Sequence, residues 1–146
     1  MANVSELLVH KGKTVHTIGK TKTVFEAISL MVAHNVDALV VLDEKMNPCG
    51  MITERDYLRK VALVGRASKT TFVQEIMSDQ LVHVDLDTPV EDCMQRMTRA
   101  RIRHLPVLSG GQLVGIVSIG DLVKFLAEER KHEIHELTAY IQGSYS

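Results

Sequence analysis

The chain contains an internal duplication, because residues 15–58 and 82–123 are divergent copies of one pattern. Each copy has to bury its apolar face against its twin, so the duplication limits the possible folds more than any other feature. Apolar positions recur in matching places: Ala27 with Cys93, Ile28 with Met94, Met31 with Met97, Leu39 with Leu105, and Val41 with Val107. We expect two packed half-domains.

Each copy has the pattern of a β-α-β-β-α unit, which predicts an α/β (α+β) fold. In the first copy, helical spacing of apolar residues follows Thr23 and Glu26, a pair typical of a helix start. The expected elements are strands over 15–18, 38–42 and 49–52 with helices over 23–34 and 53–64, then strands over 81–84, 105–108 and 113–117 with helices over 88–99 and from 118 onward. Short helices over 4–9 and 72–77 precede the two copies.

Composition narrows the class of protein. The 146 residues carry a formal net charge of −1 and are 45% hydrophobic, without tryptophan. The balanced charge argues against nucleic acid as a partner, and no apolar run reaches the roughly 20 residues of a membrane span. Cys49 and Cys93 lie among apolar neighbours without metal-ligand spacing, so we interpret them as reduced core residues. With no secretion leader visible, we expect a cytoplasmic protein.

Both copies end in the same polar signature, Gly50-x-x-Thr53-x-x-Asp56 and Gly115-x-x-Ser118-x-x-Asp121. At a strand-to-helix junction, glycine allows close approach to the backbone, and the helix start favours an anion. A carboxylate one turn later can accept hydrogen bonds from the two hydroxyls of a ribose.

The same residue types also fit a helix capping box. Two details favour ligand contact: such boxes prefer Glu or Gln where both copies have Asp, and capping does not require the preceding glycine. The hydroxyl can also cap its helix and contact a ligand at the same time.

The whole pattern resembles a tandem pair of cystathionine-β-synthase (CBS) domains. The resemblance implies domains over 10–65 and 72–130, a helical extension over 131–146, and two clefts that each take an adenosine-containing ligand. One cleft would use Ser118 and Asp121 with Thr14, Val15, Val36, Asp37 and Ala38. The other would use Thr53 and Asp56 with Leu81, Val82, Ile102, Arg103 and His104.

A basic cluster lies at Arg96, Arg99, Arg101, Arg103 and His104. We interpret Arg96 and Arg99 as solvated residues near a helix C-terminus. For Arg101, Arg103 and His104 we leave two interpretations open. They contact a ligand phosphate, or they are ordinary surface or packing residues. The same holds for Arg55, which can instead pair with a neighbouring acid.

These features predict a regulatory module that binds AMP, ADP, ATP or NAD, with S-adenosylmethionine also possible. No nucleophile or acid–base pair indicates an enzyme. The output would pass through a homodimer or an unidentified effector protein, because no effector domain is present in the sequence. A second apolar stripe, Ile134, Leu137 and Ile141, favours contact with a second chain. The alternatives are a ligand-independent scaffold and, less favoured, a nucleic-acid-binding protein.

Overall fold

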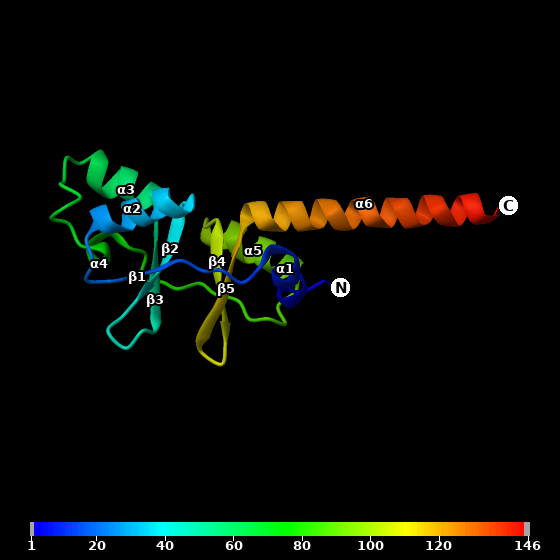
Figure 1. Cartoon of the computed structure of the whole chain (residues 1–146), viewed down its shortest axis with the longest axis horizontal. Helices are drawn as coiled ribbons and strands as arrows, with labels where there is room; N and C mark the ends of the chain where they lie inside the picture. Colours follow the sequence, from blue (N-terminus) through cyan, green and yellow to red (C-terminus); the bar gives the residue numbers. More distant parts are fainter. Residues whose placement is uncertain (1, 145–146) are drawn as a thin grey trace.

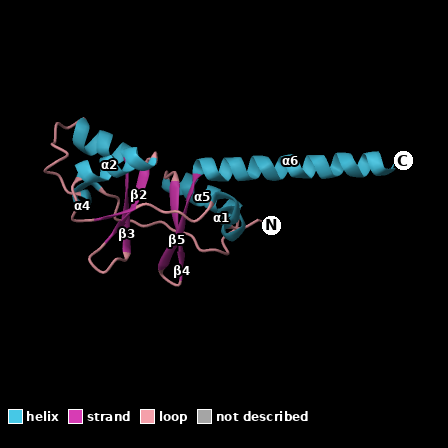
Figure 2. Cartoon of the chain, viewed as in Figure 1, coloured by secondary structure: helices cyan, strands magenta, loops and turns pink. Residues whose placement is uncertain are grey.

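The computed structural model describes residues 2–144. It has mixed helix and strand content, which confirms the α+β class (Figure 2). The elements run α1 (Val4–Lys11), β1 (Thr17–Gly19), α2 (Val24–His34), β2 (Ala38–Leu42), β3 (Pro48–Thr53), α3 (Glu54–Tyr57), the π-helical turn η1 (Leu58–Ala62), α4 (Val73–Ile76), α5 (Val90–Ala100), β4 (His104–Ser109), β5 (Gln112–Ser118) and α6 (Ile119–Ser144).

The two halves build similar sheets of unequal size. In the first, β1 pairs in parallel with β2, and β2 pairs antiparallel with β3. In the second, β4 and β5 form an antiparallel hairpin whose turn residues Gly110 and Gly111 have φ values of 58° and 80°. Positive φ at both positions is the conformation that favours glycine in tight hairpins.

The prediction of a strand over 81–84 is wrong, because only an isolated parallel bridge from Val84 to Val107 forms there. In the first half, the Val40 N–H donates to the His16 carbonyl and extends the ladder. Pro106 occupies the position that matches Val40 and has no N–H to donate. The corresponding bond is therefore impossible, and the ladder shrinks to a bridge.

The two halves exchange their leading helices. Val4 and Leu8 of α1 lie in the core of the second half, with Cys93 and Leu105, although α1 precedes the first copy in sequence. The helix α4 precedes the second copy, yet its Val73 packs in the first core. The matched apolar pairs of the two copies occupy these two cores, with Met31 at 4% exposure and Ala27, Leu39, Val41 and their partners Cys93, Met97, Leu105 and Val107 at 1% or less.

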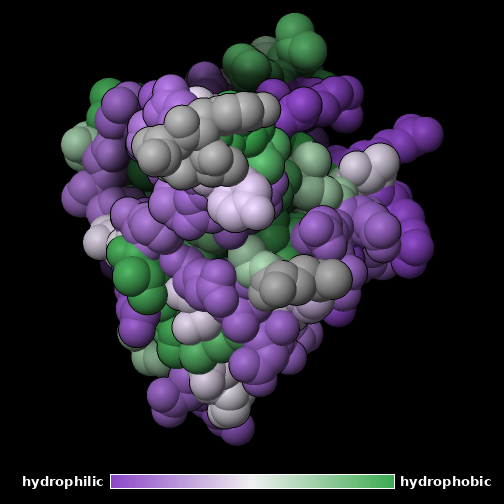
Figure 3. Space-filling model, turned by 90° about the vertical axis from the view of Figure 1, so that its right-hand side faces the viewer, coloured by the Kyte–Doolittle hydropathy of each residue, from purple (hydrophilic) through white to green (hydrophobic). Residues whose placement is uncertain are grey.

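The helix α6 starts on the second half and projects far beyond the body of the molecule (Figure 1). Its first turns are anchored by the buried Leu122 and Phe125. Farther out, Ile134, Leu137 and Ile141 are 58%, 61% and 48% exposed, so the apolar stripe does not dock on the body. Seen from the side of this projection, hydrophobic residues form small separate patches among hydrophilic ones (Figure 3). Among the described residues, no helix is long and apolar enough to cross a membrane.

Candidate functional site

A cleft of about 860 Å³ opens between the two halves at the first polar signature. Its walls come from the end of β3, from α3 and η1, from the linker around Ser78 to Val82, and from the segment that leads into β4. The structure brings together nine of the residues predicted to bind ligand: Asp37, Thr53, Arg55, Asp56, Val82, Arg101, Ile102, Arg103 and His104.

Thr53 and Asp56 form a complete capping box at the start of α3. The Asp56 N–H donates to the Thr53 hydroxyl oxygen at 3.2 Å, and the Thr53 N–H donates to Asp56 Oδ2 at 3.0 Å. The other carboxylate oxygen, Oδ1, lies 3.6 Å from Lys60 Nζ. Asp56 therefore caps the helix and also faces the cleft, so the two interpretations of the signature are compatible.

The second signature has the same cap but a different neighbour. The Ser118 N–H donates to Asp121 Oδ2 at 2.9 Å, and the Asp121 N–H donates to Ser118 Oγ at 3.1 Å. Lys11 Nζ, at the end of α1, reaches the same Oδ2 at 2.5 Å. Partial burial alone would raise the pKa of Asp121, but the hydrogen bonds from Lys11 and Ser118 and the charge of Lys11 hold it below its ordinary value of 3.8.

The signature glycines make room for the chain itself. A Cβ on Gly50 would lie 2.3 Å from the Ser78 carbonyl oxygen, and a Cβ on Gly115 would lie 2.9 Å from Leu8 Cδ1. The glycines thus permit the exchanged segments to pack against β3 and β5. Their recurrence has a structural cause and no longer favours ligand contact.

Basic side chains gather at the first cleft. The predicted Arg55, Arg101 and Arg103 line it together with two that sequence reasoning missed, Arg59 and Lys60. Both lie four residues after a predicted site residue, a helical spacing that places side chains on one face and could have identified them. Met51, Glu54, Leu58, Ser78 and Gln80 complete the lining. Away from the cleft lining, Arg96 donates to the His83 carbonyl at 2.9 Å, and Arg99 is exposed.

Of these nine residues, Asp37 was expected on the base side of the second cleft but lines the first one. The remaining predicted residues are more scattered, and Leu81 lies outside the lining of the first cleft. Of the other residues assigned to the second cleft, Thr14 is exposed and Val15 is half-buried; Val36 packs against the first core, and Ala38 is buried where it pairs with Thr53.

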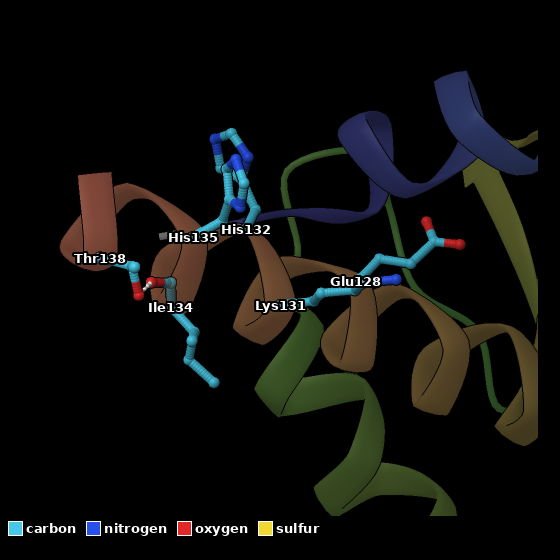
Figure 4. A pocket seen from close by; sticks show the side chains of 6 residues that line it. All are labelled: Glu128, Lys131, His132, Ile134, His135 and Thr138. Carbon is cyan, nitrogen blue, oxygen red and sulfur yellow. Dashed lines mark hydrogen bonds between the residues drawn. The ribbon is translucent and has the colours of Figure 1, made fainter. Parts of the chain in front are cut away.

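A second hollow, of about 610 Å³, lies along α6 (Figure 4). All six lining residues belong to this one helix, so it is an open helix surface. His132 and His135 project from one side and Ile134 from another. His132 Nε2 pairs with Glu136 Oε1 at 3.0 Å, and the described residues contain no cluster suited to a metal ion.

Comparison with known proteins gives consistent matches. The sequence profile of the CBS domain matches residues 4–63 and 73–128. The mitochondrial CBS domain-containing protein CBSX3 of Arabidopsis thaliana is 43% identical over 150 residues, which cover 97% of this chain and 73% of the relative.

Two solved structures are also similar. The CBS-domain protein ATU1752 from Agrobacterium tumefaciens is 38% identical, with a TM-score of 0.79 over 84% of this chain and 91% of that one. The CBS domain pair of MJ0100, solved with 5′-methylthioadenosine and S-adenosylmethionine, is 25% identical, with a TM-score of 0.77 over 88% of this chain and 98% of that one.

Proposed function

The chain belongs to the CBS-domain family as a tandem pair, and we propose that it is a regulatory module without catalytic activity that binds an adenine nucleotide. CBS pairs are ligand-binding regulatory modules, and the MJ0100 pair was solved with two adenosine-containing ligands. For this chain, the ligands we favour are AMP, ADP, ATP and NAD, which share adenosine and at least one phosphate.

The observation that carries this proposal is the composition of the first cleft. The carboxylate of Asp56, which we propose accepts hydrogen bonds from the ribose hydroxyls, lies in the same lining as a set of cations: Arg55, Arg59, Lys60, Arg101 and Arg103. Three acids, Asp37, Glu54 and Asp56, also line it, so cations exceed acids even without His104. Arginine suits bidentate contact with phosphate, and an excess of positive charge favours phosphorylated ligands over the positively charged S-adenosylmethionine.

Regulation would follow from the position of the cleft. Thr53 and Asp56 belong to the first copy, whereas Arg101, Arg103 and His104 belong to the second. A nucleotide that contacts both groups binds one arrangement of the halves more tightly and shifts the population toward it.

The change would then be passed on through a homodimer or an effector protein. The exposed Ile134, Leu137 and Ile141 follow the i, i+3, i+7 spacing of a coiled-coil seam, which supports pairing of α6 with a second copy. The same stripe is the observation in favour of the alternative function, a ligand-independent scaffold. The relative from Arabidopsis is named mitochondrial, so the cytoplasmic location stays a prediction.

Thermal unfolding with AMP, ADP, ATP, NAD and S-adenosylmethionine separates these two functions. A ligand at 100 times its dissociation constant stabilises the native state by about 2.7 kcal/mol. We expect a phosphorylated nucleotide to raise the unfolding temperature. An unchanged temperature with all five ligands, together with an intact homodimer, would favour the scaffold.

A further inference from the structure

Lys11 makes the two polar signatures of this chain unequal. Its Nζ lies 2.5 Å from both Asp121 Oδ2 and the Ile116 carbonyl oxygen. The side chains of Lys11 and Asp121 are each 25% exposed, and that of Asp56 is 20% exposed, so the two signatures differ in the partner of the carboxylate and not in its burial. The carboxylate that the second signature would offer to a ribose is therefore already bound to an ammonium group of the same chain.

The first half satisfies the matching carbonyl in another way. Met51, like Ile116, lies two residues before the signature hydroxyl, and its carbonyl accepts the Ser78 N–H at 2.8 Å. This bond forms because α4 ends at Ile76 and the chain returns to pair with β3. In the second half, α1 continues as a helix to Lys11, so a side chain supplies the missing donor.

The ion pair of Asp56 with its lysine is longer than that of Asp121. Lys60 Nζ lies 3.6 Å from Asp56 Oδ1, donates instead to the Ile76 carbonyl at 2.9 Å, and is 48% exposed. A ligand hydroxyl that approaches Asp56 meets an open cleft, whereas one that approaches Asp121 Oδ2 has to displace a partly buried ion pair with Lys11.

We propose that Lys11 closes the second cleft, so that each chain binds one adenosine ligand, at Thr53 and Asp56. The inference rests on the proposed function and specifies which cleft acts. Replacement of Lys11 by an uncharged residue of similar length frees Asp121 and opens a second site.

Equilibrium dialysis with radiolabelled AMP counts the ligand bound per folded chain. We expect one equivalent for the wild type, two for Lys11→Met, and one for the conservative variant Lys11→Arg. Lys13→Met, an exposed lysine two residues away, is the matched control and should also bind one equivalent.

Asp56→Asn in the otherwise unchanged chain gives a test that does not depend on the folding of a Lys11 variant. Its affinity for AMP should fall roughly 10- to 100-fold, because the second cleft stays closed. Two equivalents on the wild type, one on folded Lys11→Met, or one bound to Asp56→Asn with the affinity of the wild type would each overturn the inference while leaving nucleotide binding intact. If AMP, ADP, ATP and NAD all fail to bind to any of the proteins, the proposed function and the inference are overturned together.

Discussion

His104 Nε2 lies 2.9 Å from Asp37 Oδ1, and this contact joins the second copy to the first across the wall of the cleft. The His104 side chain is 14% exposed and that of Asp37 60%. Asp37 thus accepts a hydrogen bond from the His104 Nε2–H, a donor that could otherwise contact a ligand phosphate. It also adds a negative charge to a wall built mainly of cations.

Asp37→Asn should therefore strengthen nucleotide binding. Removal of the charge weakens the hold on His104 and reduces repulsion of phosphate, and we expect a gain of a few-fold for ATP and less for adenosine. Titration calorimetry in low salt measures both affinities. Asp87→Asn, at an exposed position outside the cleft lining, is the control and should change neither. Equal gains for ATP and adenosine would contradict the electrostatic explanation.

The Lys11–Asp121 pair predicts a pH-dependent stability difference. The pKa of Asp121 lies below its ordinary value of 3.8 in the folded protein, so its contribution is present above the unfolded pKa and is lost as the pH falls through the folded pKa. Lys11→Met should lower the free energy of unfolding by about 1 kcal/mol at pH 7. Urea denaturation at pH 7 and pH 3 should show the difference shrinking in acid. A constant difference would mean that Lys11 stabilises through its packing and its hydrogen bond to the Ile116 carbonyl, and not through the charge of Asp121.

Alanine should destabilise the protein by different amounts at the two signature glycines, Gly50 and Gly115. Gly50→Ala places its Cβ against the Ser78 backbone, which is fixed by two hydrogen bonds to Met51, and should destabilise by about 3 kcal/mol. Gly115→Ala meets only the side chain of Leu8 and should destabilise by about 1–2 kcal/mol.

Gly19→Ala is the matched control for both, because its nearest neighbour atom would lie 3.7 Å away. Chemical denaturation should find it close to the wild type. A Gly50→Ala protein as stable as Gly19→Ala would contradict the packing described for the linker.

The stripe on α6 predicts a dimer that depends on its apolar residues. Leu137→Glu should shift sedimentation from dimer to monomer, because it places a charge in the middle of the seam. The unfolding temperature of the body should change little, since Leu137 is 61% exposed. His135→Glu adds the same side chain on another side of the helix and should remain dimeric. Monomeric wild type, or dimeric Leu137→Glu, would contradict the role of α6.

Local patterns predicted most of the fold. The continuous apolar run predicted β2, the helical spacing of apolar residues and the capping pair predicted α2, and the two glycines predicted the β4–β5 hairpin. These elements were predictable because they depend on residues close in sequence. The exchange of α1 and α4 between the halves was missed, since an apolar helix shows only that it packs and not where. The lost strand at 81–84 follows from a single residue, Pro106, on a neighbouring element.

The site was predictable to a similar extent. Thr53, Asp56 and the 101–104 segment meet in the cleft because the duplication makes the two halves face each other. Lys11 could not be found from the sequence, because its contact with Asp121 spans 110 positions and depends on where α1 packs. The interpretation of the glycines failed for the same reason: the groups that approach them come from distant segments.

Titration calorimetry of Asp56→Asn against the wild type tests nucleotide binding most directly. Asparagine retains an acceptor for the helix cap but loses the charge that would hold the ribose hydroxyls. Among AMP, ATP, NAD and S-adenosylmethionine, we predict saturable binding of at least one phosphorylated ligand to the wild type. The variant should bind it roughly 10- to 100-fold more weakly, as expected for loss of a charged hydrogen bond of about 1.5–3 kcal/mol. Flat traces with all four ligands, or equal affinities for the two folded proteins, would contradict the account.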